Sequence, residues 1–288
     1  KNNIIKKILL EKLIKKKNIR LISNNNLKTI DHKQSSLICT FKEIKIDTKL
    51  LIAADGKNSK VRNIFRTPVY KKDYKQKALV VNFLHEKDHS STAHELFFKS
   101  GPLAILPMKK NKKNIFSSSL IWSHESEFID SLSKIDKDLL ISLLEEKIYN
   151  YVGKIKKIAE VQTFNLSAHI NRSFFENRVL YLGDSAHSIH PIAGQGWNLG
   201  IRDIEKCLEV LRNGMNMGLD IGSKFICEEY NNKTFYDSYT LFQITDKLNS
   251  IFLNDNFLVN KFREQGFSLI NKNQNIRNFI TNFAMGFN

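Results

Sequence analysis

The sequence predicts a mixed α/β fold, and three observations lead to that prediction. Hydrophobic residues make up 42% and charged residues 26% of the 288 residues, which is the balance of a globular chain. Apolar residues recur at helical spacing in some segments and alternate as in strands in others. Two strand-like segments, Leu50–Ala53 and Arg178–Leu182, lead into Asp-Gly and Gly-Asp turns. At about 150 residues per domain, the length allows about two domains.

The first half of the chain is predicted to be one helix followed by a section rich in strands. Residues 4–17 place apolar side chains at helical spacing, with lysines on the opposite face. Short segments with alternating polarity follow, and the polar stretches between them suit turns. We expect strands at Ile19–Ile22, Leu37–Phe41, Ile44–Ile46, Leu50–Ala53, 78–84, 95–98, Leu103–Pro107 and Phe116–Trp122.

The second half is predicted to contain both element types before it becomes helical. An amphipathic pattern predicts a helix at 137–149, and a strand near 159–164 follows. Arg178–Leu182 has the continuous apolar run of a buried strand. A helix is expected at Gln195–Asn213. Few helix-breaking residues occur after it, so the chain to Asn288 is expected to be largely helical.

The charge limits the partners that we expect. Lysine and arginine exceed aspartate and glutamate by 16, but the basic residues are mostly scattered lysines rather than an arginine-rich patch. The sequence has no zinc-finger, RNA-recognition or basic-zipper pattern, so we expect no nucleic-acid partner. We interpret the charge as a solvated basic face, which also allows weak attraction to an anionic membrane surface.

The length of the apolar runs and the spacing of the cysteines indicate the cellular compartment of the protein. The longest apolar runs have the length of a strand, well short of the ~20 residues of a membrane helix. The first 20 residues are basic but lack the apolar core and the cleavage site of a signal peptide. The three cysteines are far apart in sequence and do not suit a disulfide framework. We therefore expect a cytoplasmic protein, and its basic face predicts peripheral contact at the inner face of the membrane.

The turn after the first strand has residues that suit a ligand. Asp55-Gly56 stands at the carboxyl end of a strand, where α/β sheets bind ligands. Gly56 permits positive φ and close approach of the backbone. Ser59 is placed to cap a following helix, with Arg62 near its start. An Asp-Gly dipeptide alone is a common turn, so it indicates a binding site only in combination with the second turn, which is described next.

The turn after the second strand has a longer pattern. Gly183-Asp184 ends the strand, and the loop Pro191–Gly196 then leads into a helix. The free N–H groups and the positive dipole end of that helix suit an anionic or electron-accepting group. An Asp at a strand end accepts hydrogen bonds from sugar-like hydroxyls, and Gly194 and Gly196 leave space for a flat ring against the backbone.

Three other interpretations of the second turn are weaker. Its glycines do not have the spacing of the dinucleotide fingerprint. His187-x-x-His190 offers two metal ligands, but no further Cys, His or carboxylate has ligand spacing, so we expect no metal. Ser185 has the place of the nucleophile in some lipases and esterases, but no histidine follows His190 to serve as its base.

The two turns in this order, about 130 residues apart with a sheet-rich section between them, resemble the group A FAD-dependent aromatic hydroxylases. The resemblance implies an FAD/NAD(P)-binding Rossmann-like fold with an inserted sheet-rich substrate domain. It also implies that Asp55, Gly56 and Arg62 serve FAD and NAD(P)H, and that Gly183 and Asp184 hold the ribityl chain of FAD. The residues implied near the isoalloxazine ring are Pro191, Gly194, Gln195, Gly196, Trp197 and Asn198.

Further stretches resemble the hydroxylases of ubiquinone biosynthesis, namely 190–203, Gly101–Pro107, Thr245–Phe252, Arg263–Gly266 and Ala284–Gly286. This resemblance implies that FAD, NAD(P)H and O₂ are used to hydroxylate the ring of a polyprenylated phenol, with other ubiquinone-pathway proteins as partners. His187 and His190 are candidates for a base toward the phenol, although a structural role is the commoner one. Two alternatives stay open: a hydroxylase of a soluble aromatic acid, and a catalytically inactive accessory subunit of a quinone-pathway complex.

The resemblance also predicts how the chain is divided. Residues 1–70 and 166–215 are expected to form a split FAD-binding domain, 71–165 the substrate-binding sheet domain, and 216–288 a C-terminal helical region. Family members begin with a βαβ unit that carries G-x-G-x-x-G, and none of the 12 glycines here forms that pattern. We therefore expect that the first βαβ unit, roughly 100 residues, is missing and that the chain by itself is inactive.

Overall fold

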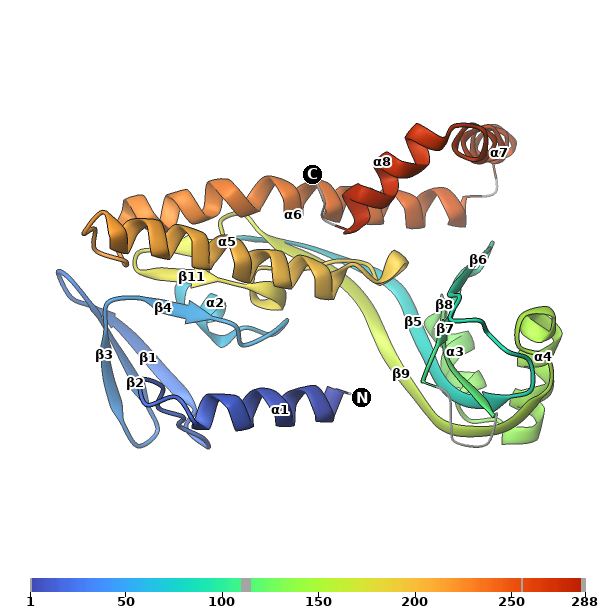
Figure 1. Ribbon diagram of the computed structural model, residues 1–288, viewed down its shortest axis with the longest axis horizontal. Helices are drawn as coiled ribbons and strands as arrows, with labels where there is room; N and C mark the ends of the chain where they lie inside the picture. The colour runs from blue at the N-terminus through green and yellow to red at the C-terminus, as the bar shows by residue number, and fades with distance from the viewer. Residues whose placement is uncertain (1, 110–114, 255, 286–288) are drawn as a thin grey trace.

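The computed structural model describes residues 2–109, 115–254 and 256–285 (Figure 1). Within these residues, the strands form two three-stranded sheets and one six-stranded sheet. The remaining residues, 1, 110–114, 255 and 286–288, belong to the predicted domains but lie outside the described part. The combination of helices and strands confirms the predicted mixed α/β fold.

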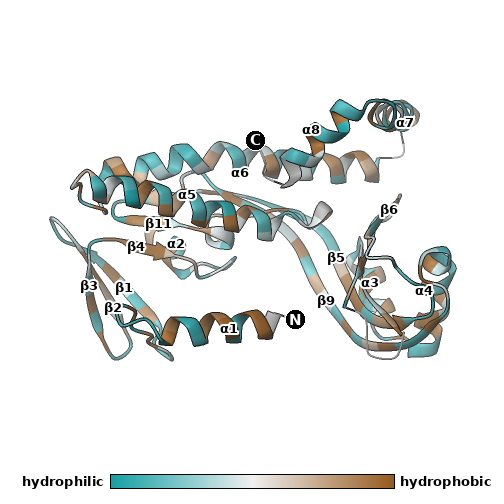
Figure 2. Cartoon of the chain, in the orientation of Figure 1, coloured by the Kyte–Doolittle hydropathy of each residue, from teal (hydrophilic) through white to brown (hydrophobic). Residues whose placement is uncertain are grey.

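The N-terminal part consists of one helix and an antiparallel sheet. Helix α1 (Asn2–Ile14) forms where helical spacing predicts it, and hydrophobic residues recur along it (Figure 2). Its apolar side chains are largely exposed. The predicted strand at Ile19–Ile22 is wrong, because these residues join no sheet and their apolar side chains do not pack against one face. The sheet consists of β1 (Leu27–His32), which the sequence patterns missed, β2 (Leu37–Phe41) and β3 (Lys45–Thr48).

A pair of parallel strands leads into both turns. β4 (Leu51–Ala53) pairs in parallel with β11 (Val179–Tyr181), and β10 (Phe175–Glu176) pairs antiparallel with the other side of β11. All three residues of β11 are buried, as their continuous apolar run predicts. Because parallel strands end at the same edge of a sheet, the residues after β4 and β11 lie next to each other.

Two long strands connect this part of the molecule to the six-stranded sheet. β5 (Val69–His85) and β9 (Ile155–Asn171) run antiparallel, side by side, from the parallel pair to the far end of the molecule (Figure 1). The sheet continues beyond β5 with β8 (Phe116–Glu125), β7 (Gly101–Pro107) and β6 (His94–Phe98), and β12 (His187–Ser188) pairs with β9. The predicted domain boundaries at 70 and 165 fall inside β5 and β9, and the division into domains stays a prediction.

Each part of the molecule has its own hydrophobic core. One core joins β4 and β11 to helices α2 (Lys60–Phe65), α5 (Gly196–Asn216) and α6 (Lys224–Leu253). The other lies between the six-stranded sheet and helices α3 (Ser126–Leu132) and α4 (Lys137–Val152). We call the part of the molecule around the first core the turn region, and the part around the second core the sheet region.

The described residues that follow α5 are mainly helical, as the scarcity of helix-breaking residues predicts. Helix α6 packs along α5, and α7 (Phe257–Lys272) and α8 (Gln274–Met285) follow near its C-terminal end (Figure 1). Within the described ranges, no helix is long and apolar enough to cross a membrane.

Candidate functional site

The first turn lies at the end of β4 and is held by its own polar side chains. The Asp55 carboxylate accepts hydrogen bonds from the backbone N–H groups of the first two residues of α2, at 2.7 and 3.2 Å. Ser59 caps the same helix by accepting from the N–H of Arg62. Gly56 has a φ of +84°, a value that favours glycine. The turn residues therefore supply partners for helix N–H groups that lack them within the helix.

Arg62 joins the first turn to the second. It is 5% exposed and donates to the carbonyl oxygens of Lys57 (2.6 Å) and Ser185 (3.2 Å). Its guanidinium also lies 2.8 Å from Nε2 of His169 on β9. Burial, and next the charge of Arg62, lower the pKa of His169 to about 3. His169 is therefore neutral at pH 7, and its Nε2 accepts the hydrogen bond from Arg62.

The second turn lies beside the first because β4 and β11 are parallel. Gly183 has a φ of +58°, and Asp184 after it is exposed at the surface. The Ser185 hydroxyl is buried and donates to the carbonyl oxygen of Ala53, 2.6 Å away, which ties the turn to β4. A serine held in this way is not available as a nucleophile, which argues against the hydrolase interpretation.

A carboxylate that the sequence patterns did not single out holds the second turn in place. Asp203 on α5 accepts from the backbone N–H of Gly183 (2.8 Å) and lies 2.7 Å from Nε2 of His187. Asp203 and His187 are each 1% exposed, so each depends on this contact for a partner. A signal was present in the sequence. Asp203 stands among Leu199 and Cys207 at helical spacing, and a charge on a buried helix face needs a partner.

The two histidines considered as bases have different surroundings. His187 is engaged with Asp203, whereas Nδ1 of His190 accepts from the N–H of Ile192 (3.3 Å). Burial lowers the pKa of His190 to about 4, so it is neutral at pH 7 and carries its proton on Nε2. The His190 ring packs edge-on against Tyr74, with ring centroids 4.7 Å apart. A role as a base toward substrate stays a prediction for both histidines.

The glycines of the two turns border open space. Gly194 (φ +61°) and Gly196 have no atom within 4 Å of the place that a Cβ would take, and the same holds for Gly56 and Gly183. Packing within the described part of the chain therefore does not require glycine at these four places. The space beside them is open to a ligand.

The residues around Gly194 and Gly196 present backbone N–H groups at the start of α5. Pro191 and Asn198 are exposed, Trp197 is 69% exposed, and Gln195 is buried, with its side chain accepting from the Asn198 amide (3.3 Å). The Gln195 side chain does not cap α5. Among the described residues, the N–H groups in the first turn of this 21-residue helix thus have no side-chain cap and can bind an acceptor.

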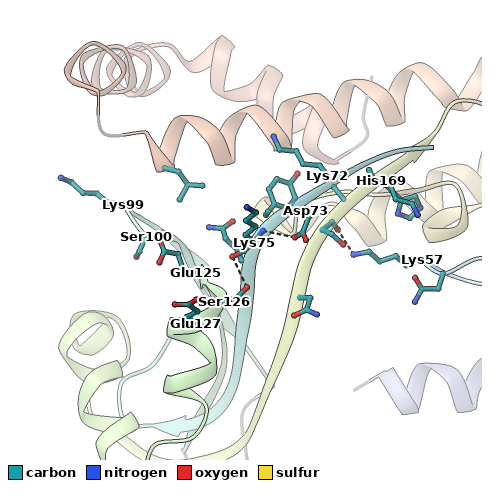
Figure 3. Close-up of a pocket in the computed structure, with 18 of the residues that line it drawn as sticks. Lys57, Lys72, Asp73, Lys75, Lys99, Ser100, Glu125, Ser126, Glu127 and His169 are labelled. Carbon is teal, nitrogen blue, oxygen red and sulfur yellow. Dashed lines mark hydrogen bonds between the residues drawn. The ribbon is translucent and has the colours of Figure 1, made fainter. Parts of the chain in front are cut away.

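A large basic cavity borders the first turn. It has a volume of about 1130 Å³ and extends along β5 and β9 from Lys57 and His169 at one end to Lys99 and Glu127 at the other (Figure 3). Positive charge dominates its lining. The basic residues are Lys57, Arg62, Lys71, Lys72, Lys75 and Lys99, and the acidic ones are Asp73, Glu125 and Glu127.

A smaller cavity of about 280 Å³ lies between the six-stranded sheet and the loop before α5. Strands β7 and β8 and the loop supply most of its lining, which includes Pro102, Ala104, Leu106, Ile121, Pro191 and Ile192. His94 and Glu95 of β6 and Ser123 of β8 are its polar lining residues. We call it the apolar cavity. The first turn thus borders one cavity, and the glycine-containing loop borders the other.

Comparison with known proteins assigns the chain to a family. A family described as "FAD binding domain" matches residues 5–216. The chain is 30% identical over 241 residues to the ubiquinone hydroxylase UbiL of Rhodospirillum rubrum, which covers 84% of the chain and 55% of that protein. It is 26% identical over 275 residues to the mitochondrial ubiquinone biosynthesis monooxygenase COQ6 of Schizosaccharomyces pombe, covering 82% and 56%. The chain belongs to the FAD-binding monooxygenases, and it spans about half the length of the curated relatives it matches.

Solved structures share the fold. The p-nitrophenol 4-monooxygenase PnpA from Pseudomonas putida superposes with a TM-score of 0.75 at 16% identity, covering 98% of this chain and 72% of that one. PqsL, a probable FAD-dependent monooxygenase from Pseudomonas aeruginosa, gives 0.72 at 16% identity, covering 87% and 70%. These likenesses confirm the mixed α/β fold of the flavin monooxygenase type with its antiparallel sheet.

The residues present fit FAD, the cofactor that the family indicates. A Cβ at any of the four turn glycines would project into the open space beside the backbone, where a flat ring needs close approach. The exposed Asp184 carboxylate suits ribityl hydroxyls, and the N–H groups at the start of α5 suit the acceptor atoms of a flavin.

Proposed function

We propose that this chain is the flavin- and phenol-binding part of a hydroxylase in ubiquinone biosynthesis. The reaction consumes O₂, NAD(P)H and a proton. One oxygen atom replaces a ring hydrogen of a polyprenylated phenol as a hydroxyl group, and the other leaves as water with NAD(P)⁺. One observation carries the proposal: two turns meet at the edge of one parallel strand pair, beside open glycine positions and two cavities. The similarity to UbiL and COQ6 supports it.

FAD supplies the oxygen-activating chemistry when it is bound. Gly183 and Asp184 are proposed to hold its ribityl chain, and the segment Gly194–Asn198 its ring. Asp203 contributes by holding the Gly183 N–H, and therefore the turn, in place. Neither packing nor a positive φ requires glycine at Gly196, so a chain that had lost its flavin would have no physical need for it, which favours the enzyme over an inactive accessory subunit.

The apolar cavity is the proposed phenol site. Among the described residues that line it there is no lysine or arginine, although a carboxylate substrate would call for such a cation. The lining therefore favours a phenol with a hydrocarbon substituent over a soluble aromatic acid. The sheet and the loop would cover two sides of the ring that is to be oxidised.

The basic cavity is the proposed site of NAD(P)H. A pyrophosphate carries negative charge, and Lys57 and Arg62 of the first turn line this cavity together with lysines of β5. Burial is the main cause of a lowered pKa at both Lys57 and Arg62, and an anionic ligand beside them would raise both pKa values again.

Flavin binding is the first test. The chain contains the proposed contacts to the ring and the ribityl chain, so we expect riboflavin and FAD to bind it with similar affinity, measured by quenching of flavin fluorescence. Asp184→Ala should weaken both about tenfold, the size of one hydrogen bond to a charged group. Asp138→Ala, an exposed aspartate on α4, is the matched control. Wild-type chain that quenches neither flavin contradicts the proposal.

Catalysis is tested after joining the chain to the part of the R. rubrum relative that it does not match. We expect the joined protein to hold yellow flavin and to oxidise NAD(P)H faster when a prenylated phenol is added. A joined protein that stays colourless with added FAD would support the accessory-subunit alternative instead.

Helices α7 and α8 offer a surface for the proposed contact with an anionic membrane. Phe257, Leu258, Leu269 and Phe279 are each more than 60% exposed. Residues 256–285 contain four basic side chains and one acidic side chain. Exposed apolar groups beside positive charge fit the headgroup region of an anionic bilayer.

Flotation with anionic vesicles tests this contact. We expect the wild-type chain to float at low salt, and the double variant Leu258→Asp with Phe279→Asp to remain in solution. Leu139→Asp on α4 changes a side chain of comparable exposure elsewhere and should float like wild type. Equal flotation of all three proteins would contradict the role of α7 and α8.

A further inference from the structure

An aspartate of helix α6 reaches across to strand β5. Asp246 lies in the segment Thr245–Phe252, which the proposed function does not use. Its carboxylate lies 2.6 Å from the Lys72 ammonium and accepts from the Tyr74 hydroxyl at 3.1 Å. The Asp246 side chain is 16% exposed, so most of the carboxylate is shielded from water. One acceptor on the helix therefore holds two donors from the same strand.

Strand β5 is irregular where these donors stand. Its pairing with β9 shifts register between Asp73 and Gln76, and Lys75 has a φ of +53°. Tyr74 lies inside this irregular stretch and has no register partner on β9. The sheet ladder therefore does not fix the Tyr74 side chain, and the contact with Asp246 does.

Tyr74 stays a donor under all ordinary conditions. Burial, and next the charge of Asp246, raise the pKa of the Tyr74 hydroxyl well above its usual value. The Lys72 ammonium also lies 5.5 Å from the centroid of the Tyr74 ring. The ring is thus oriented both through its hydroxyl and through its face.

The Tyr74 ring in turn packs against the loop of the apolar cavity. It meets the ring of His190 at 88° with centroids 4.7 Å apart. Pro191 and Ile192, which follow His190 directly, line the cavity, and Nδ1 of His190 accepts from the Ile192 N–H. A displacement of the Tyr74 ring would therefore move the wall of the cavity.

We propose that Asp246 is a positioning residue for the phenol site, because it holds the Tyr74 ring against His190 and so fixes the loop that lines the apolar cavity. The inference rests on the proposed function only in taking this cavity as the place of the phenol. Lys72 completes the arrangement by neutralising the carboxylate.

The test uses the whole chain, NMR of the His190 ring, and a small phenol. The ring signals are assigned by their loss in His190→Gln. We expect them to shift in Asp246→Asn and in Tyr74→Leu, because a neighbouring aromatic ring shields nuclei according to its position. The matched control is Asp237→Asn, which removes another paired carboxylate of α6, bound to Arg202 and Lys206 instead of β5, and should leave the His190 signals unchanged.

Affinity for 2-allylphenol provides the second measurement. We expect its dissociation constant, followed by NMR titration, to rise about tenfold in Asp246→Asn and to stay at the wild-type value in Asp237→Asn. If Asp246→Asn does not fold, Tyr74→Phe, which removes only the hydroxyl donor, is expected to give the same two changes.

The outcomes separate this inference from the proposed function. Unchanged His190 signals in the Asp246 and Tyr74 variants overturn the positioning role, and so does a shift of the signals with unchanged phenol affinity. If the wild-type chain binds no 2-allylphenol, the assignment of the cavity as the phenol site fails. The His190 signals alone then support or overturn the proposal that Asp246 holds the Tyr74 ring against His190.

Discussion

Gly101 in the sheet region and the three glycines next to the second turn in the turn region border different surroundings. At Gly101, where β7 begins in the sheet region, φ is +134° and a Cβ would lie 2.2 Å from the carbonyl oxygen of Ser123. At Gly183, Gly194 and Gly196 in the turn region, a Cβ would meet no atom within 4 Å. The first glycine is required by the chain packing on itself. The others border room that the described chain leaves open. Positive φ still favours glycine at Gly183 and Gly194, whereas at Gly196 neither packing nor φ requires it, so Gly196 carries the clearest information about a ligand.

Gly101→Ala should be the most damaging of the changes that test this comparison. The added Cβ clashes with backbone and forces a conformation that side chains rarely adopt, so we expect the free energy of unfolding to fall by about 4 kcal/mol. Urea denaturation measures it. Gly266→Ala on α7 has open space and no positive φ, and should be as stable as wild type or slightly more so. A Gly101→Ala chain with wild-type stability would contradict the packing role.

Asp203→Ala tests whether buried polar contacts hold the turn region as packing holds the sheet region. The change leaves the Gly183 N–H and the His187 ring buried without their acceptor. We expect a loss of about 3 kcal/mol in the free energy of unfolding. Asp237→Ala, which breaks a more exposed ion pair on α6, should cost clearly less. Equal losses for the two variants would mean that Asp203 acts as an ordinary surface carboxylate.

Local sequence patterns predicted the elements that their own residues mark clearly by periodicity. The strands at Leu37–Phe41 and Leu103–Pro107 and the helix after Gln195 appear where periodicity places them. Ile19–Ile22 failed because alternation cannot tell whether a neighbouring strand exists to receive the apolar face. The full lengths of β5 and β9 depend on each other, and periodicity marked only part of each.

The candidate site shows the same division. Both turns and Arg62 followed from residue types next to strand ends. The partners of these residues did not, because they are distant in sequence: His169 lies 107 positions from Arg62, and Tyr74 lies 172 from Asp246. Such pairs arise only when the chain folds. Asp203 is the exception, since a charge at an apolar helix position indicates in advance that a buried partner exists.

The pH dependence of stability tests the surroundings of His169, which lies on the strand that joins the two regions. Its pKa is about 3 in the folded chain, against about 6.5 when unfolded. Between these values only the unfolded chain takes up the proton, so stability present above pH 6.5 is lost as the pH falls toward 3. From pH 7 to pH 5 the loss from this residue is about 2 kcal/mol.

Urea denaturation at the two pH values measures this loss. His169→Gln keeps an acceptor for Arg62 without a titrating ring, so its difference in unfolding free energy between pH 7 and pH 5 should be smaller by about 2 kcal/mol. His32→Gln removes an exposed histidine and should keep the wild-type difference. If His169→Gln does so as well, the ring is not held neutral in the folded chain.

Gly196→Ala is expected to change stability least and to be the most informative about the ligand. Gly196 is the first residue of α5, has no positive φ and borders open space, so alanine fits the fold. We expect the free energy of unfolding to stay the same or to rise by less than about 1 kcal/mol, the usual effect of alanine in a helix. The same Cβ projects into the space proposed for the flavin ring, so flavin affinity should fall by at least about tenfold, a loss of roughly 1.4 kcal/mol.

The two measurements on Gly196→Ala have to be read together, with Gly266→Ala as the matched control. Gly266 also lies in a helix and borders open space, but it is far along the chain from both turns, so its variant should bind flavin like wild type. Stable Gly196→Ala with weakened flavin binding means that the glycine serves the ligand. Stable Gly196→Ala with wild-type flavin binding means that the open space belongs to something else, and the contrast between the two regions then no longer locates the cofactor.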